Sequence, residues 1–266
     1  MASIRVGVGG WVFAPWRGVF YPEKLPQSQE LHHASRRLTS IEINGTFYGS
    51  QKPASFRRWH DETPEDFVFS LKGPRAVTHR KALADSAQSI EWFFSTGVLE
   101  LREKLGPILW QFPGYTRFDP ALFAAFLELL PHAIDGRAIR HAVEVRHASF
   151  LTPGFIELLR RHRVAPVLVD GEGHPAIADA TCDFAYARLR RCVASCPTGY
   201  PPAALDLWAA RFRRWSLGGE PEDVERRHPD PAPEQAPRDC FVYFISGAKE
   251  RAPAAAEALI QRLAAG

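Results

Sequence analysis

Short hydrophobic segments recur along the whole chain, and most are followed by a stretch in which apolar residues have helical spacing. Each segment is four to six residues long and rich in Val, Ile, Leu or Phe. Continuous apolar runs of this length are typical of strands that are buried on both faces of a parallel sheet. The eight segments cover residues 4–8, 40–43, 67–71, 108–112, 142–145, 166–169, 184–189 and 241–244.

The intervening stretches carry signals of helix starts. Asp119-Pro120 and Thr152-Pro153 each combine a residue that caps helix N-termini with a proline suited to the first helical position, and an apolar stripe follows both pairs. The connection near residues 173–180 leaves room only for a short helix. Further helices are predicted over residues 27–38, 53–60, 201–215 and 253–263.

Eight strand–helix units in 266 residues amount to about 33 residues per unit, the size expected of a (β/α)8 barrel. The alternative, a doubly wound open sheet, would have fewer strands and a glycine-rich phosphate loop after the first one. The sequence GVGGW at residues 7–11 places a tryptophan where such a loop needs a helix to begin. We therefore predict an α/β protein with a single TIM-barrel-like domain over residues 1–266.

Residues 218–239 interrupt this alternation. They are polar, rich in proline and without periodicity, which predicts a flexible surface insertion before the last strand. A lid over the active site is the alternative interpretation.

Composition excludes several classes of protein. An apolar fraction of 45% with 31 aromatic residues excludes a disordered chain, and no apolar run is long enough to span a membrane. The first residues lack the order of a signal peptide, and the four cysteines form neither a disulfide framework nor a CxxC pair. We expect reduced thiols and a cytoplasmic location. The net charge of +3 does not by itself indicate nucleic-acid binding.

Polar residues follow most of the predicted strands. In a (β/α)8 barrel the C-terminal ends of the strands meet at one mouth, where active sites lie. Because side chains alternate along a strand, Glu42 should share a face with Asn44, and Glu144 with Arg146. The residues predicted to carry the chemistry are Glu42, Lys72, Glu144, Arg146 and Asp170. Those predicted to bind the ligand are Trp11, Asn44, Tyr48, Arg75, His79, Gln111, His147, Arg188, Tyr243 and Ser246.

Cations outnumber carboxylates among these residues, which favours an anionic ligand. The loops after the seventh and eighth strands, RLRR and ISGAK, lie where this fold usually binds phosphate, and backbone N–H groups of residues 246–248 could contribute. The structural alternatives are a buried layer of ion pairs without a catalytic role, and Arg190 and Arg191 as solvated surface charges.

Other chemistry has less support. No dinucleotide fingerprint, GxSxG elbow or HExxH motif is present, so the cofactor is unknown. A divalent metal held by His79, His147, Glu42, Glu144 or Asp170 is compatible with the sequence but not favoured, because ligands from separate strands leave no spacing signature. Trp11 and Tyr48 are candidates for stacking on a sugar or base.

Several blocks in fixed order make the chain resemble the DUF72, or YecE-like, family of uncharacterised proteins. They are GGWVFAPWRGVFYPEKLP, IEINGTFYG, FRRWHDETPEDFVFSLKGPRAVTH, LGPILWQFP, VEVRHASF, the aspartate of VLVD, FAYARL and FVYF. The resemblance covers nearly the whole chain and implies a TIM-barrel-like fold but no settled activity. The chain departs from the family pattern at Arg190-Arg191, where His-Gly is usual, and at Ile245-Ser246, where Asn or Asp residues are usual.

The sequence therefore predicts an enzyme of the hydrolase or lyase/isomerase type that acts on a small anionic, phosphorylated or sugar-like substrate. Glu42 or Glu144 would be the general base, and Lys72 with Arg146 would stabilise developing negative charge. The alternatives are a nucleic-acid-binding or repair-type protein that uses the basic rim, and a non-catalytic ligand sensor. The sequence indicates no membrane partner and no oligomeric state.

Overall fold

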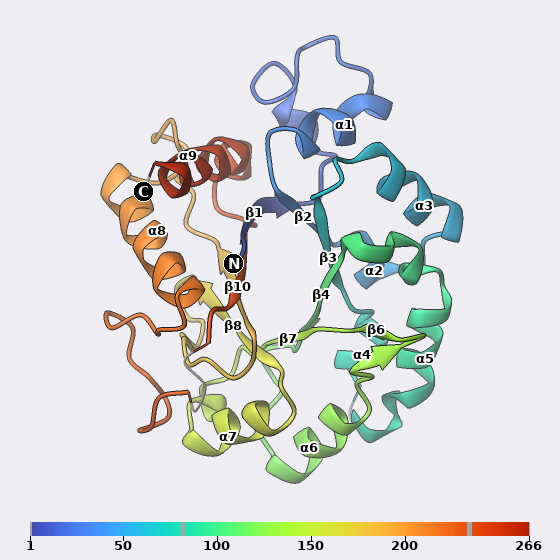
Figure 1. The fold of residues 1–266 in the computed structure, drawn as a ribbon, viewed down its shortest axis with the longest axis vertical. Helices are drawn as coiled ribbons and strands as arrows, with labels where there is room; N and C mark the ends of the chain where they lie inside the picture. Colours follow the sequence, from blue (N-terminus) through green and yellow to red (C-terminus); the bar gives the residue numbers. More distant parts are fainter. Residues whose placement is uncertain (1, 81–82, 233–235, 266) are drawn as a thin grey trace.

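Eight parallel strands close into a barrel in the computed structural model, which describes residues 2–80, 83–232 and 236–265 (Figure 1). Around the barrel the order is β1, β2, β3, β4, β7, β8, β9 and β10, and β10 pairs with β1. The strands are β1 (Ile4–Gly9), β2 (Ser40–Ile43), β3 (Val68–Lys72), β4 (Leu105–Gln111), β7 (His141–Glu144), β8 (Ala165–Asp170), β9 (Phe184–Leu189) and β10 (Asp239–Phe244). The predicted (β/α)8 fold is confirmed.

Helices surround the outside of this barrel (Figure 1). The α-helices are α1 (Glu30–Ser35), α2 (Gly45–Tyr48), α3 (Pro53–Glu62), α4 (Arg75–Thr78), α5 (Ala87–Ser95), α6 (Pro120–Glu128), α7 (Pro153–Arg161), α8 (Pro202–Ser216) and α9 (Ala252–Ala264). Short 3-10 helices are η1 (Ala14–Trp16), η2 (Gln27–Gln29), η3 (Leu83–Ser86), η4 (Val98–Lys104), η5 (Ala148–Phe150) and η6 (Lys249–Arg251), and β5 (Ala133–Ile134) pairs with β6 (Arg137–Ala138). Within the described residues, no helix has the length and apolar character needed to cross a membrane.

The predicted elements agree with the structure at most positions. The bounds of β2 and β9 are those predicted. Asp119 caps α6 by accepting a hydrogen bond from the Leu122 amide at 3.0 Å, and Thr152 caps α7 through the Phe155 amide. The four cysteines are free thiols, as expected.

The connection between β8 and β9 differs from the prediction, because residues 171–183 contain no helix. Gly173 has a φ of 70°, and Pro175 follows shortly after it, so the segment is unsuited to helix formation. The Asp179 carboxylate instead accepts hydrogen bonds from the amides of Arg227 and His228 at 2.9–3.0 Å. The predicted short helix near 173–180 was therefore wrong.

Those two amides belong to the predicted insertion, which has no helix or strand in its described residues 218–232 and 236–238. The insertion is anchored at further points: Glu220 accepts a hydrogen bond from the Ala180 amide at 2.7 Å, and Arg160 of α7 donates to the Asp230 carbonyl at 3.1 Å. It is therefore bound to the β8–β9 connection and to α7. Its flexibility stays a prediction.

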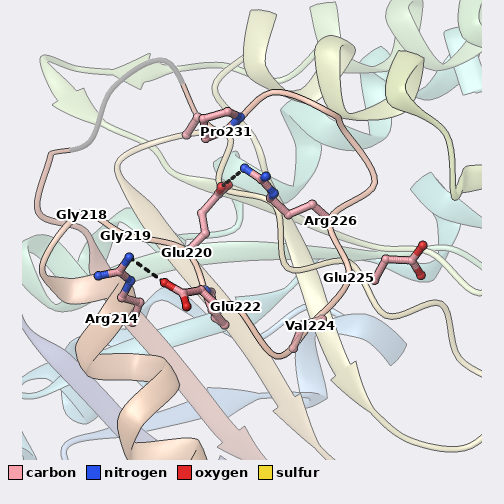
Figure 2. Close-up of a pocket in the computed structure, with 11 residues that line it drawn as sticks. Arg214, Gly218, Gly219, Glu220, Glu222, Val224, Glu225, Arg226 and Pro231 are labelled. Carbon is pink, nitrogen blue, oxygen red and sulfur yellow. Dashed lines mark hydrogen bonds and ion pairs between the residues drawn. The ribbon is translucent and has the colours of Figure 1, made fainter.

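The insertion also encloses a hollow of about 420 Å³. Figure 2 shows two ion pairs in its wall, Arg214 with Glu222 at 3.1 Å and Arg226 with Glu220 at 3.6 Å. Each of these charges already has an opposite charge beside it. Glu225, which also lines the hollow, pairs with Arg227 at 2.5 Å, so the described residues of its wall offer a ligand no uncompensated charge.

The barrel interior depends on a close approach between β1 and β2. A Cβ placed on Gly7 would lie 1.8 Å from the Ser40 carbonyl oxygen, which is backbone and cannot move aside. A Cβ on Gly9, two residues further along the same strand, would meet only side-chain atoms of Asn44 and Ile245 at 3.0 and 3.2 Å. Only glycine fits at the first position, whereas a methyl group at the second needs a small adjustment.

We predict that Gly7→Ala destabilises the protein by about 3 kcal/mol or more, beyond the usual range of overpacking, because β1 must separate from β2. Gly9→Ala is the matched control and should cost about 1 kcal/mol. Urea unfolding followed by circular dichroism measures both. Equal losses in the two variants would contradict this account of the barrel closure.

Candidate functional site

Arg188 of β9 lies at the centre of a buried ionic network at the C-terminal ends of the strands. Its Nε and Nη2 donate to the Glu42 carboxylate at 3.1 and 2.9 Å, and its Nη1 donates to Glu144 Oε2. Arg188 is 3% exposed and both glutamates are fully buried. One guanidinium thus joins β2 to β7 across the barrel, in the geometry that makes Arg–carboxylate pairs strong.

Two tyrosines support this network from below. Tyr186 shares a strand face with Arg188, and its hydroxyl donates to Glu42 Oε2 at 2.7 Å. Tyr243 stacks obliquely on Tyr186, and its hydroxyl bonds to the side chains of Ser40 and Ser70 at 2.7 Å each. Tyr243 is fully buried, so the structure places this predicted ligand-binding residue beneath the mouth rather than at it.

Lys72, the last residue of β3, extends the network on the other side. Its Nζ donates to Gln111 Oε1 at 2.6 Å, and Gln111 in turn donates to Glu144 Oε1 at 2.7 Å. The Nζ also lies 3.8 Å from the centroid of the Phe47 ring. Within the described residues no carboxylate is within 4 Å of this ammonium group, although the side chain is only 6% exposed.

The pKa values of Glu144 and Lys72 depart from the ordinary values in ways that follow from these contacts. Burial alone would raise the pKa of Glu144, but the guanidiniums of Arg188 and Arg146 outweigh it and lower the pKa to about 2. Burial, followed by repulsion from Arg188, lowers the pKa of Lys72 to about 8 despite the attraction of the two glutamates. Glu144 is therefore a weak base, whereas Lys72 exchanges a proton near neutral pH.

Arg146 and His79 lie nearer to solvent above this network. Arg146 donates to Glu144 Oε1 at 3.1 Å with a third of its side chain exposed. The His79 ring packs 5.5 Å from Phe47 and 6.5 Å from Tyr115, and burial together with Arg75 and Lys72 lowers its pKa. Arg75 is exposed and has no ion pair within the described part of the chain. The rim beside Lys72 is thus cationic and aromatic.

Tyr48 contributes to the same rim. Its ring packs edge-on against Phe47 at 5.1 Å and is 80% exposed. Exposure of this extent leaves much of a large aromatic ring in contact with solvent, and its role in stacking on a ligand stays a prediction.

A second cluster lies at the ends of β8 and β9. Asp170 accepts a hydrogen bond from the Tyr200 hydroxyl at 2.8 Å and lies 3.7 Å from Arg191. Arg190 donates to the Ser246 hydroxyl at 3.0 Å. Arg190 and Ser246, which belong to the two segments where the sequence departs from the pattern of the family it resembles, therefore contact each other directly.

One amide of the predicted phosphate loop is engaged within the chain. The Ala248 amide donates to the Cys192 carbonyl at 2.8 Å, so it is not available to an anion. A Cβ on Gly247 would lie 2.5 Å from the same carbonyl. A backbone anion site formed by the amides of Ser246 and Gly247 stays a prediction.

Two predicted residues lie apart from the network. Trp11 packs edge-on against Trp59 of α3 and Phe69 at 5.1 and 6.3 Å, in the layer between barrel and helices. His147 caps η5, with its Nδ1 accepting from the Ser149 amide. Asn44, directly after β2, has helical backbone angles, and its Nδ2 donates to the Glu42 carbonyl at 3.4 Å.

Sequence reasoning missed two members of the site. Tyr186 stands two residues before Arg188, and the alternation rule would have placed both on one face. Phe47 follows β2 in a short helix that the spacing of hydrophobic residues does not predict. No group of three or more His, Cys, Asp or Glu side chains among the described residues is arranged to hold a metal.

Comparison with known proteins identifies related sequences. The chain is 32% identical over 126 residues to the UPF0759 protein YecE of Escherichia coli strain K12, covering 47% of this chain and 44% of that protein. It is 28% identical over 160 residues to the UPF0759 protein YunF of Bacillus subtilis strain 168, covering 58% and 54%. The chain thus aligns with only about half the length of these curated relatives.

Solved structures share the fold over nearly the entire chain. A DUF72 family protein from Thermotoga maritima MSB8 has a TM-score of 0.72 at 24% identity and covers 99% of this chain and 100% of that one. A DUF72 family protein from Enterococcus faecalis V583 has a TM-score of 0.69 at 15% identity and covers 98% of each chain. The model of the family described as protein of unknown function DUF72 matches residues 5–266, and the chain therefore belongs to the DUF72 family.

Proposed function

We propose that this protein is an enzyme that acts on a small anionic substrate at the C-terminal mouth of the barrel. The observation that carries the proposal is the charge balance of the buried network. Lys72, Arg146 and Arg188 supply three positive charges, and Glu42 and Glu144 supply two negative ones, which leaves one positive charge uncompensated. A buried cation without a partner costs free energy, so an anionic group that enters the mouth is favoured.

The contacts support different roles for the members of the network. Glu42 has its oxygens engaged by Arg188 and Tyr186, so we assign it the task of fixing Arg188 rather than that of a general base. Glu144 fixes Arg146 in the same way. Arg146 and Arg75, both open to solvent, would bind the anion, and Lys72 would be the group that reacts or exchanges a proton with the substrate.

The nucleic-acid alternative has weaker support from the geometry. Arg191 pairs with Asp170 and Glu172, and Arg190 bonds to Ser246 and His174, so much of the basic rim is already engaged. Binding to DNA or RNA that falls steeply with salt would favour this alternative.

Inorganic phosphate should stabilise the protein through the mouth cations. At ten times its Kd, the melting temperature should rise by roughly 3–5 °C. Arg146→Gln and Arg75→Gln should each reduce this shift, whereas Arg191→Gln, which removes an exposed arginine already paired with carboxylates, should leave it unchanged. Differential scanning fluorimetry measures the shifts. A shift of the same size in all four proteins would place the anion elsewhere and contradict the proposal.

Glu144→Gln and Lys72→Met should change stability in opposite directions at pH 7. Glu144→Gln leaves Arg188 with one carboxylate and should cost about 3–5 kcal/mol, as expected when a buried pair loses one partner. Lys72→Met removes a buried cation and should raise the free energy of unfolding by about 1 kcal/mol, because reactive residues are often kept at a cost in stability. Urea denaturation measures the free energy of unfolding of both variants. A lower free energy of unfolding in Lys72→Met would show that Lys72 is a structural residue.

The pH dependence of each effect has a defined sign. The pKa of Glu144 is depressed on folding from 4.5 to about 2, so its stabilisation is complete above pH 4.5 and is lost as the pH falls towards 2. The pKa of Lys72 is lowered on folding from 10.5 to about 8, so the destabilisation of the folded state by charged Lys72 is complete below pH 8. This destabilisation disappears as the pH rises to 10.5. The difference in the free energy of unfolding between wild type and Glu144→Gln should therefore become smaller at acid pH. The difference between wild type and Lys72→Met should become smaller at alkaline pH. Differences that do not depend on pH would contradict these assignments.

Turnover separates an enzyme from a ligand sensor. Wild type and Lys72→Met are incubated with a mixture of phosphorylated and carboxylated metabolites, and mass spectrometry follows depletion and formation. We expect one substrate to be consumed by the wild type and not by the variant. Saturable binding without consumption would identify a sensor.

A further inference from the structure

Two buried lysines in this protein have contrasting surroundings. The Lys104 Nζ donates to the His60 carbonyl, the Thr63 carbonyl and the Thr63 hydroxyl at 2.6–3.3 Å, so its three hydrogens are all engaged. The Lys72 Nζ has one acceptor, Gln111, and otherwise faces the Phe47 ring. Lys104 is therefore a structural cation, whereas the surroundings of Lys72 also suit a neutral amine.

We propose that Lys72 forms a Schiff base with a small carbonyl compound that carries a carboxylate or phosphate group. The inference rests on the proposed function, and it specifies the reacting group of the substrate. It also selects lyase or isomerase chemistry over hydrolysis, because an amine–carbonyl adduct activates neighbouring C–H or C–C bonds rather than water.

Lys72 is positioned for this reaction by the strand that carries it. It is the last residue of β3, at the mouth of the barrel where catalytic side chains of this fold lie. In the neutral amine one hydrogen can donate to Gln111 Oε1, which is held in place by its own bond to Glu144. This bond limits the directions that the nitrogen lone pair can take, and burial of the side chain disfavours the charged form.

The charged groups around Lys72 favour a supply of neutral amine near pH 8. The pKa of Lys72 is about 8 because burial and Arg188 outweigh the glutamates, so about a tenth of the side chains are neutral at pH 7. Depression of a lysine pKa by an apolar pocket and a second cation is a known way to make a nucleophile. The titratable and charged groups that act on Lys72 are Glu42 from β2, Glu144 from β7, Arg146 after β7, Arg188 from β9 and His79 after α4.

The anionic group of the substrate would lie at Arg146. Lys72, Gln111, Glu144 and Arg146 form one continuous chain of hydrogen bonds. The amine and the exposed guanidinium are therefore held on a single scaffold. A carbonyl compound with an anionic group can contact both, and the anion would offset the positive charge of the protonated imine.

The step balances without a cofactor, an oxidant or a reductant. The Lys72 nitrogen attacks the carbonyl carbon, a C–N bond forms, and the electron pair of the C=O double bond moves to oxygen. Both hydrogens of the amine pass to that oxygen, which leaves as water while the C=N double bond forms. Protonation of the nitrogen then makes the imine an acceptor for electrons from an adjacent C–H or C–C bond.

Reductive trapping tests the proposal. The full chain is incubated at pH 8 with pyruvate or with dihydroxyacetone phosphate and sodium cyanoborohydride, which reduces an imine to a stable secondary amine. Intact-mass measurement and peptide mapping then locate the adduct. The two probes distinguish a carboxylate from a phosphate as the anion. Lys72→Arg and Lys72→Met remove the amine, and circular dichroism confirms that each variant is folded. Lys249→Arg is the matched control, because Lys249 also lies over aromatic rings but is more exposed.

We expect one saturable adduct on Lys72 with at least one probe, at a rate at least tenfold above that of any other lysine. It should be absent from both Lys72 variants, unchanged in Lys249→Arg and slowed by inorganic phosphate. Two outcomes would overturn the Schiff base and leave the proposed function standing. In the first, adducts are spread over exposed lysines. In the second, no adduct forms although a probe still raises the melting temperature through Arg146. Neither adduct nor any effect of phosphate or probe on melting would overturn both.

Discussion

The ion pairs that Arg188 makes with Glu42 and Glu144 constrain everything else at the mouth of the barrel. Removing three charged groups from water costs several kcal/mol for each ion, and only close geometry repays that cost. The barrel provides the geometry because three strands present these side chains at one level. The closed sheet and the ionic network therefore require each other: the strands align the charges, and the charges make incorrect strand registers unfavourable.

Lys72 differs from these charges in being buried without a carboxylate beside it. Gln111 separates it from Glu144, so the attraction that would hold its proton acts through an intervening amide. Of the two buried cations at this mouth, Lys72 is the one that can lose its proton near neutral pH, because an arginine guanidinium stays charged. The network thus concentrates protonation changes near neutral pH on one side chain.

The sequence predicted the barrel because buried parallel strands leave long apolar runs, and it predicted most of the network because strand ends converge. Glu144 and Arg146 were paired correctly by alternation. The helical backbone angles of Asn44, directly after β2, are not described by that alternation. Trp11 was expected at the mouth, but the loop after β1 turns it towards α3. The direction of a loop is set by tertiary packing, which a local sequence pattern does not predict. For the same reason, the sequence did not predict the contact of Phe47 with Lys72.

The sector between β8 and β9 has a consequence for the order of folding. Residues 220–232 bind the β8–β9 connection at Asp179 and Ala180, which lie 40 to 49 positions earlier in the chain. During synthesis, this connection therefore emerges before the segment that holds it. A nascent chain that stalls before residue 220 leaves the Asp179 carboxylate and the Ala180 amide without these partners, so this sector is completed late in synthesis.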